Sequence, residues 1–241
     1  MRRRRQKPLQ EHEATVESLS HDGKGICRIE GKVIFVSGAL PGERIRFSFR
    51  PHKKSHDEGN LIEVLEASPD RIEPKCKHYG VCGGCSFMHL SSEKQIEEKQ
   101  KVLIDGLKHI GRVEAGEILP PLTTNPWGYR RKARLGVKFV YKKEKVLVGF
   151  RERSAPYLAE LEQCEVLHPD AGMRLTSFAT LIRDLSCYEK IAQIEVAIAD
   201  NISAFVFRNL VELTEEDKKN LNNYAKTVAI AINLQPIEPD T

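Results

Sequence analysis

Three of the six cysteines lie within ten residues, and their spacing is the strongest chemical signal in the chain. Cys76, Cys82 and Cys85 form a C-x5-C-x2-C pattern. Gly83 and Gly84 stand between the last two cysteines, where residues without side chains let the backbone bend so that both sulfurs face one centre. They also leave amide groups free to donate to the sulfides of an iron–sulfur cluster. The pattern therefore predicts a metal centre, because disulfides do not persist in a reducing cytosol.

Two kinds of metal centre, and one alternative without metal, fit this cysteine pattern. A 4Fe–4S cluster held by four thiolates is the first interpretation. Structural zinc is the second, because a four-cysteine zinc site uses the same ligands, although such sites more often contain two close cysteine pairs. Free buried thiols are the alternative. A four-coordinate site needs one more thiolate, for which the candidates are Cys27, Cys164 and Cys187.

The second chemical signal is a local excess of positive charge. The net charge of the chain is only +4, but residues 127–153 contain ten Lys and Arg against two acids, whereas residues 154–241 contain seven against fourteen. A segment dominated by one sign is typical of a polyanion-binding surface. We predict that a hairpin over 130–152 presents this charge to phosphates, and the alternative is a merely solvated hairpin. The residues expected to make these contacts are Arg130, Arg131, Lys132 and Arg134, helped by Lys142, Lys143 and Lys145.

Residues 13–70 are expected to form a small β-barrel of OB type. Five short strand-like runs broken by Gly and Pro support this expectation, over residues 14–19, 25–29, 32–36, 44–49 and 61–67. Within the run 44–49, Ile45, Phe47 and Phe49 alternate with polar residues, so they should face the core while the arginines face solvent. The polar segment 51–59 is expected to be a loop. Nucleic-acid contacts are predicted for Arg44, Arg46, Arg50, Lys53 and Lys54. The alternative is that the arginines only solubilise this face.

The remaining segments indicate a chain of four parts. These are a basic arm (1–12), the barrel (13–70), an irregular cysteine segment with a helix and linker (71–126), and an α+β domain with the basic hairpin (127–241). Ser92 should cap the first helix, with Gln95 in the capping-box position. Its apolar stripe is expected to consist of Ile96, Leu103, Leu107 and Ile110. In the last part we expect a helix over 170–185, a hairpin over 191–208, a helix capped by Thr214 and a strand over 228–234.

Composition limits the class of protein. No apolar run approaches the ~18 residues of a membrane span, and no apolar signal core follows the N-terminal arginines. We expect a cytoplasmic monomer without membrane association.

Several motifs together resemble one family. Residues 20–25 and 36–43 resemble a TRAM domain, a small RNA-binding barrel. The cysteine pattern, with Gln163-Cys164 downstream, is similar to the iron–sulfur motif of bacterial 23S ribosomal RNA (uracil-5-)-methyltransferases. The segment 127–134 is similar to that family's Tyr-Arg-Arg-Lys/Arg strand. The resemblance implies that Cys164 is the fourth cluster ligand, that ribosomal RNA is the partner, and that Cys27 and Cys187 only pack.

The resemblance also implies chemistry that this sequence lacks. Family members continue into a domain that binds S-adenosylmethionine and supplies a nucleophilic cysteine and a general-base glutamate. No glycine-rich loop in this sequence follows a strand and opens a helix, as such a cofactor site requires. We therefore expect no catalytic or S-adenosylmethionine-binding residue here, an inactive chain, and cofactor binding only in that missing domain. The alternative is a standalone RNA-binding iron–sulfur or zinc module.

Overall fold

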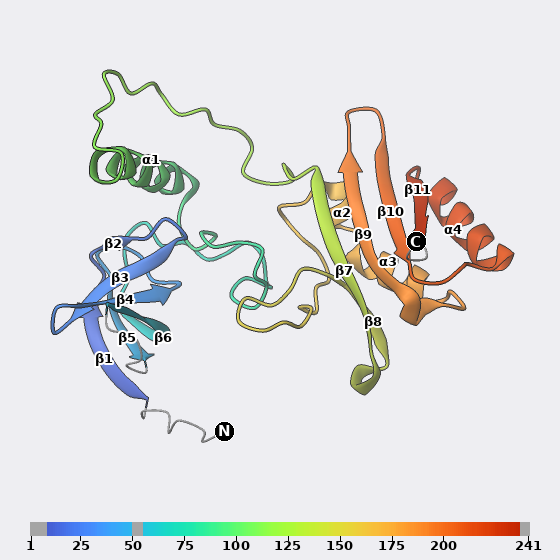
Figure 1. The fold of residues 1–241 in the computed structure, drawn as a ribbon, viewed down its shortest axis with the longest axis horizontal. Coiled ribbons are helices and arrows are strands. Elements are labelled where there is room, and N and C mark those ends of the chain that lie inside the picture. The colour runs from blue at the N-terminus through green and yellow to red at the C-terminus, as the bar shows by residue number, and fades with distance from the viewer. Residues whose placement is uncertain (1–8, 50–54, 237–241) are drawn as a thin grey trace. The chain divides into compact units, whose positions relative to one another are not determined.

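The computed structural model describes residues 9–49 and 55–236 and divides the chain into two compact units (Figure 1). The first unit contains the residues up to Lys75 together with Cys85–Thr123, and the second contains Cys76–Gly84 and the residues from Thr124 onward. The segment predicted over 71–126 is thus divided. Its cysteine loop folds with the second unit, whereas its helix folds with the first.

The first unit is built on a six-stranded sheet in the order β1-β5-β6-β4-β3-β2. Its strands are β1 (Gln10–Thr15), β2 (Ser18–Leu19), β3 (Lys24–Ile29), β4 (Lys32–Ser37), β5 (Arg44–Phe49) and β6 (His56–Glu66). Neighbouring strands are antiparallel, except that β4 and β6 are parallel. The alternating residues Ile34, Val36, Ile45 and Phe47 are fully buried in one core. The predicted apolar face is therefore confirmed, while closure of the sheet into an OB barrel stays a prediction.

Two strands of this sheet differ from the sequence-based prediction. β6 begins at His56, inside the predicted loop, because it pairs with β4 on one side and with β5 on the other. The strand expected over 14–19 is interrupted at Val16 and Glu17. There the two backbone N–H groups turn to other partners, the carbonyls of Glu43 and Ile26, at 2.9 and 2.8 Å.

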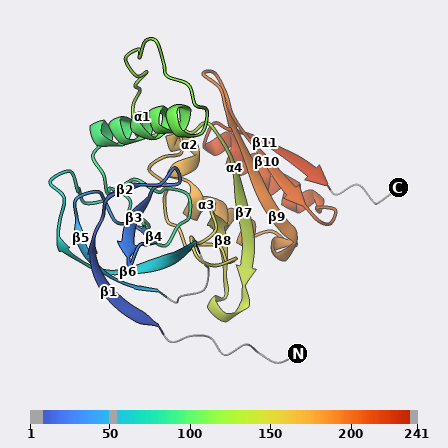
Figure 2. The same cartoon turned by 60° about the vertical axis from the view of Figure 1, so that its left-hand side comes forward.

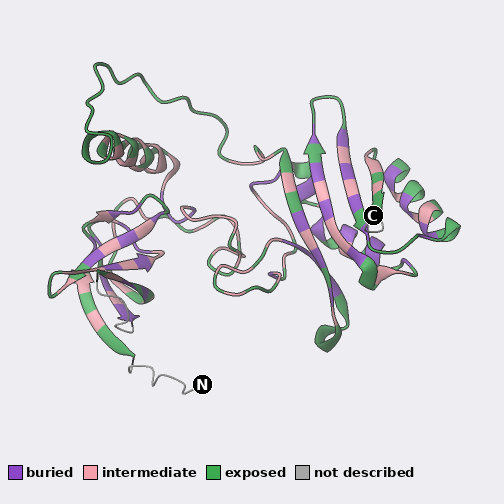
Figure 3. Cartoon of the chain, in the orientation of Figure 1, coloured by how far each residue is buried: buried purple, intermediate pink, exposed green. Residues whose placement is uncertain are grey.

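Helix α1 (Ser92–His109) begins one residue earlier than predicted. The cap is Ser91, whose hydroxyl accepts a hydrogen bond from the backbone N–H of Lys94, and Gln95 donates its side-chain amide to the carbonyl of Leu90. None of the helix residues is buried (Figure 3). Leu103 is 62% exposed. The apolar stripe predicted for this helix therefore finds no cover among the described residues.

The second unit has a five-stranded sheet in the order β11-β10-β9-β7-β8. Its strands are β7 (Lys132–Val140), β8 (Lys145–Gly149), β9 (Ile191–Ile198), β10 (Ser203–Asn209) and β11 (Ala231–Pro236). Its helices are α2 (Pro169–Gly172), α3 (Leu175–Arg183) and α4 (Glu215–Thr227), with short 3-10 turns η1 (Tyr141–Lys143) and η2 (Tyr188–Lys190). Only β10 and β11 are parallel. The β7–β8 hairpin extends beyond the other strands (Figures 1 and 2).

The helices of the second unit cover one face of its sheet. Leu135 of β7 and Phe205 of β10 share a fully buried core with Phe178 of α3. Along β7 and β10, buried residues alternate with more exposed ones (Figure 3). The helix predicted over 170–185 is broken between α2 and α3. At the break, Gly172 approaches the carbonyl oxygen of Cys164 so closely that a Cβ would collide with it. The other face of the sheet carries polar residues and holds the candidate site.

The cap of α4 agrees with the prediction. Thr214 and Asp217 form a reciprocal capping box, and the Asp217 carboxylate also accepts hydrogen bonds from the backbone and the hydroxyl of Ser186, at 2.8 and 2.6 Å.

In the described part of the chain, no helix combines the length and the apolar character needed to cross a bilayer.

Candidate cysteine centre and basic strand face

The cysteine loop, residues 76–84, is hydrogen-bonded to the segment that follows β8. The N–H of Gly83 donates to the carbonyl of Arg151 at 2.9 Å, and the N–H of Arg153 donates to the carbonyl of Val81 at 2.8 Å. Cys82 and Glu152 form an isolated antiparallel bridge. The loop thus extends the second unit by backbone pairing, which fixes the position of Cys82.

Side chains between Cys76 and Cys82 add further attachments. The imidazole Nε2 of His78 accepts a hydrogen bond from the backbone N–H of Glu162 at 3.1 Å, and Lys77 forms an ion pair with the Glu162 carboxylate. The guanidinium of Arg153 lies 5.6 Å from the centre of the Tyr79 ring, within the range of a cation–π contact. Residues far apart in sequence are therefore joined close to Cys164.

The thiols of Cys76, Cys82 and Cys164 are half-buried and close enough to influence one another. Burial raises the pKa of Cys76 and of Cys82, and the negative charge of Cys164 raises both further. Backbone N–H groups act in the opposite direction: His78 and Tyr79 donate to Cys76, and Gly84 donates to the Cys82 sulfur at 3.4 Å. Half-buried thiols that accept N–H donors suit thiolate ligands of a metal centre.

The remaining predicted ligand, Cys85, belongs to the first unit. As the side chains stand in residues 9–49 and 55–236, no three Cys, His, Asp or Glu groups are close enough together to hold a metal ion. Cys27 is fully buried in the core of the first unit, where burial raises its pKa to about 11, and Cys187 packs beside the core of the second unit. Those environments suit packing cysteines.

Two of the basic residues predicted to bind phosphates, Lys132 and Arg134, lie on β7. Leu135 and Val137 point into the core, so Lys132, Arg134 and Lys138 point to the open face of the sheet. Lys138 is not among the residues predicted to bind phosphates, although its spacing of four residues from Arg134 places it on the same face.

Two of the predicted arginines precede β7 and have different surroundings. Arg130 donates its backbone N–H to Val166 at 3.0 Å, and its guanidinium lies 6.0 Å from the centre of the Phe150 ring. Arg131 forms an ion pair with Asp200 at 2.9 Å. The four predicted residues therefore do not act alike, as their alternation along the strand indicates.

Carboxylates offset part of the positive charge. Arg134 pairs with Glu195 at 3.2 Å, directly across the β7–β9 ladder. Lys143 and Lys145 both pair with Glu160 and lower the pKa of its carboxyl to about 2. Among the described residues, Lys132 and Lys138 have no carboxylate partner within 4.0 Å. The open charge of this face is thus concentrated on these two lysines.

The arginines of β5 are more completely paired. Arg44 contacts Glu13 and Glu66 at 2.9 and 3.2 Å, and Arg46 contacts Glu13 and Glu63 at 3.0 and 2.8 Å. This pairing favours the alternative stated above, a charged face that keeps the sheet soluble. The other residues predicted to bind nucleic acid here, Arg50, Lys53 and Lys54, lie outside the described residues.

Comparison with known proteins identifies the relatives of this chain. Residues 5–46 match the TRAM domain family. The chain is 47% identical over 235 residues to the 23S rRNA (uracil(1939)-C(5))-methyltransferase RlmD of Alkalilimnicola ehrlichii. The aligned residues make up 98% of this chain and 53% of that protein. It is 47% identical over 234 residues to RlmD of Nitrosococcus oceani, covering 96% of this chain and 52% of that protein. Its similarity is to RNA uracil-C5-methyltransferases. The chain spans about half the length of the curated relatives it matches.

A solved structure shares the fold. The crystal structure of the Pyrococcus abyssi tRNA (uracil-54, C5)-methyltransferase in complex with S-adenosyl-L-homocysteine matches 86% of this chain and 48% of its own chain, with a TM-score of 0.59 and 19% identity. The TRAM domain and the methyltransferase relatives thus agree with the resemblance found in the sequence motifs. The iron–sulfur cluster and its ligand set stay predictions.

Proposed function

We propose that this chain is the RNA-capturing part of an S-adenosylmethionine-dependent methyltransferase that forms 5-methyluridine in 23S ribosomal RNA. The observation that carries this proposal is the 47% identity over 98% of the chain to a protein named for that reaction. The TRAM match at residues 5–46 and the open lysines of β7 are two further features suited to an RNA-binding protein.

The phosphate contacts are proposed for the open face of β7. Lys132 and Lys138 provide charge that no carboxylate of residues 9–49 and 55–236 pairs with, while Arg130, Arg131 and Arg134 add donors around them. A lysine or arginine that neutralises a phosphate releases a counterion, so binding should weaken as salt rises. Replacing one such residue should lower the slope of log affinity against log salt by about one unit.

RNA binding is tested with the whole chain and a loop-containing fragment of 23S ribosomal RNA. We expect tight, salt-dependent binding by filter retention or fluorescence anisotropy, and weaker binding to a perfect duplex, since sequence-specific RNA recognition needs unstacked bases. Absence of salt-dependent binding to either RNA would contradict the proposed function.

The second part of the proposal concerns the metal. Cys76, Cys82, Cys85 and Cys164 would hold a 4Fe–4S cluster, and the N–H donors at Cys76 and Cys82 support thiolate ligation there. When bound, such a cluster supplies bonds from iron to thiolate that tie distant segments together. Cys82 of the cysteine loop and Cys164, 82 positions apart, would then be joined in addition to the hydrogen bonds between their segments.

Metal analysis separates the cluster from zinc. After anaerobic purification we expect iron and sulfide but no stoichiometric zinc. Cys164→Ser should lose the iron, whereas Cys187→Ser, which changes another half-buried cysteine of the same unit, should keep it. Stoichiometric zinc would overturn the cluster, and retention of iron in Cys164→Ser would overturn the ligand set.

The third part concerns catalysis. We propose that the methyl donor binds outside these 241 residues, because no glycine-rich loop in this sequence follows a strand and opens a helix. Calorimetric titration of the chain with S-adenosylmethionine should give no heat of binding, and a methyl-incorporation assay on ribosomal RNA should give no product. Micromolar binding of the cofactor would contradict this part alone and leave RNA capture intact.

A further inference from the structure

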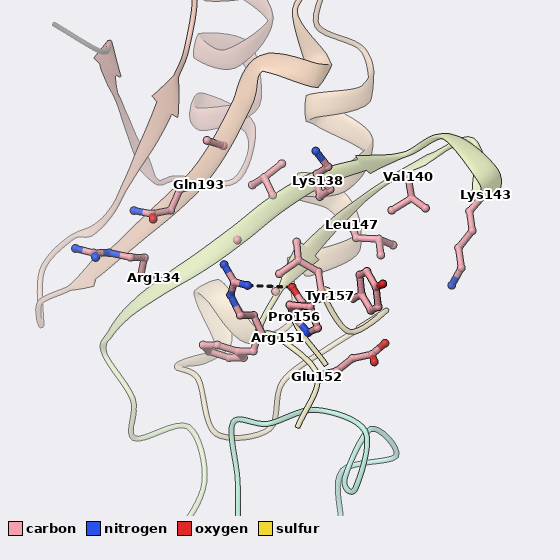
Figure 4. Close-up of a pocket in the computed structure, with 16 residues that line it drawn as sticks. Arg134, Lys138, Val140, Lys143, Leu147, Arg151, Glu152, Pro156, Tyr157 and Gln193 are labelled. Carbon is pink, nitrogen blue, oxygen red and sulfur yellow. Dashed lines mark hydrogen bonds between the residues drawn. The ribbon is translucent and has the colours of Figure 1, made fainter. Parts of the chain in front are cut away.

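The open face of the second unit's sheet holds a pocket of about 710 Å³ that includes residues outside the predicted phosphate contacts (Figure 4). Ligand-binding pockets span about 300–1,000 Å³, so the size suits a bound nucleotide. One side is the strand face of β7, with Arg134 and Lys138. The other side is the segment 150–158, which folds back over the sheet.

Hydrogen bonds hold this segment in a narrow loop. The N–H of Ala159 donates to the carbonyl of Phe150, and the N–H of Glu152 donates to the carbonyl of Tyr157, both at 2.9 Å. At its base, Leu158 lies over Gly136 of β7, where a Cβ would come within 2.7 Å of the leucine side chain. The pocket wall is therefore built into the fold by a glycine on the strand and a paired loop above it.

The cysteine loop supports the same wall. The carbonyl of Arg151 accepts the N–H of Gly83, and Glu152 forms a bridge with Cys82. The backbone at Arg151 and Glu152 therefore forms part of the pocket wall and also pairs with the cysteine loop. All of these residues belong to the second unit.

The side chains at the pocket combine open cations with an exposed aromatic ring. The Nη1 group of Arg151 donates to the carbonyl of Pro156 at 2.9 Å, which orients the guanidinium and leaves its other donors available. Within the described part of the chain, neither Arg151 nor Lys138 has a carboxylate within 4.0 Å, although Glu152 also lines the pocket. Tyr157 is 69% exposed and lines the pocket together with Leu147 (Figure 4).

We propose that this pocket takes one unstacked nucleotide of the bound RNA, with its base against Tyr157 and its phosphate on Arg151 and Lys138. Every base has a π-face that stacks on an aromatic ring, and a neighbouring cation suits the phosphate. The proposal rests on the RNA capture proposed above and names the place where one nucleotide leaves the strand.

The surroundings favour a nucleotide within an RNA strand over a free small molecule. Lys132 and Arg134 lie on the same face of β7 as Lys138, and residues two apart on a strand are separated by about 7 Å. The cations therefore form a row along which an extended phosphate backbone can continue past the pocket. A free metabolite would use only the pocket and would not need this row.

The test uses the whole chain, purified with its metal, and a single-stranded RNA of mixed sequence. Tyr157→Ala should weaken RNA binding about tenfold, since base–aromatic stacking is worth about 1–3 kcal/mol per base. The salt slope should stay unchanged, because no charge is lost. Tyr157→Phe keeps the ring and should bind as the wild type does. The matched control is Tyr141→Ala, because Tyr141 is equally exposed at 69% but lies outside the pocket.

A charge variant provides an independent readout. Lys138→Gln should lower the salt slope by about one unit, whereas Lys226→Gln on α4 should not change it. If the wild-type chain binds no RNA, the proposed function fails. If it binds RNA but Tyr157→Ala and Lys138→Gln behave like their controls, the pocket proposal fails and RNA capture stands. Tight binding of free uridine or adenosine monophosphate, lost in Tyr157→Ala while RNA affinity is unchanged, would show a small-molecule site instead.

Discussion

β5 and β7 carry the same pattern of cations on alternating positions, but the strands beside them differ in how many carboxylates they place opposite those cations. The two arginines of β5 face three carboxylates, from Glu13 of β1 and from Glu63 and Glu66 of β6. The three cations on the open face of β7 face one paired carboxylate, from Glu195 of β9. A row of cations on a strand therefore does not by itself predict a polyanion-binding surface, because the charges opposite decide what remains open.

Exposure follows the same difference. The side chain of Arg46 is 39% exposed, and that of Arg134 is 73% exposed although both form an ion pair. A phosphate that approached β5 would have to displace carboxylates from both arginines. On β7 it would meet two lysines that have no carboxylate partner in the described residues.

Glu43 in the first unit is a fully buried carboxylate that is paired with a cation of the same chain. Its carboxylate accepts hydrogen bonds from Arg71 at 2.5 and 2.7 Å and from the backbone N–H groups of Leu40 and Ser68. Glu43→Gln would leave Arg71 without its counter-charge, so we expect a loss of about 3–5 kcal/mol in unfolding free energy. Urea denaturation of the whole chain measures it, and the control Glu63→Gln, which changes an exposed pair, should lose less than about 1 kcal/mol.

Acid should weaken the same pair. Burial is the largest influence on the pKa of Glu43 and raises it, but Arg71 and the two backbone donors together hold the pKa below its ordinary value of 4.5. The stabilisation is therefore present above about pH 4.5 and is lost as the pH falls through the lower pKa of the folded chain. A stability of wild type that did not decline below pH 4.5 relative to Glu43→Gln would contradict this account.

The next largest effect is expected from neutralising β7. Lys132→Gln combined with Lys138→Gln should lower the salt slope of RNA binding by about two units, because two lysines that we propose to contact phosphates lose their charge. Arg44→Gln combined with Arg46→Gln removes as much charge from β5 and should change the slope by much less. Fluorescence anisotropy over a series of salt concentrations measures both. Equal losses in the two double variants would remove the distinction between the strands.

The converse change should create binding where none is expected. Glu13→Gln combined with Glu63→Gln removes carboxylates from both arginines of β5 while leaving their guanidinium groups in place. We expect the salt slope of RNA binding to rise by up to about one unit, since the freed arginines become available to phosphates. A slope that stayed at the wild-type value would show that the position of β5, as well as its pairing, keeps it away from RNA.

Local patterns predicted the elements well and the charge environment poorly. The alternation of Ile45, Phe47 and Phe49 placed the core face of β5 correctly, and the Thr214 capping box followed from spacing alone. The partners of Arg44 and Arg134 lie tens of residues away and become neighbours only through strand register. The pocket also depends on a loop that folds over Gly136, and the local spacing of residues does not predict this packing.

The helices show the same limit. Ile96, Leu103 and Leu107 have the spacing of a buried stripe, yet none of them is buried in α1. A periodic pattern predicts which side of a helix seeks apolar cover, but it does not identify the segment that supplies it.

The smallest effect is expected at the tip of the β7–β8 hairpin. Glu160 pairs with Lys143 and Lys145, which lower the pKa of its carboxyl to about 2. Its ion pairs should therefore persist at every pH well above 2. Their contribution to stability is present above about pH 4.5 and is lost as the pH falls toward 2. Because these side chains are more than 40% exposed, that contribution should stay below about 1 kcal/mol.

Carbon NMR of the Glu160 side chain tests this pairing directly, with Glu144 of the same hairpin as an internal reference. A titration midpoint near 2 for Glu160 would mean that Lys143 and Lys145 are paired with it and are not available to phosphates. Glu160→Gln should then raise the salt slope of RNA binding. A midpoint near 4.5 would mean that both lysines are unpaired in solution. In that case the hairpin tip would join Lys132 and Lys138 as an open phosphate-binding surface, and the contrast between β7 and β5 would be larger than the pairing in the structure indicates.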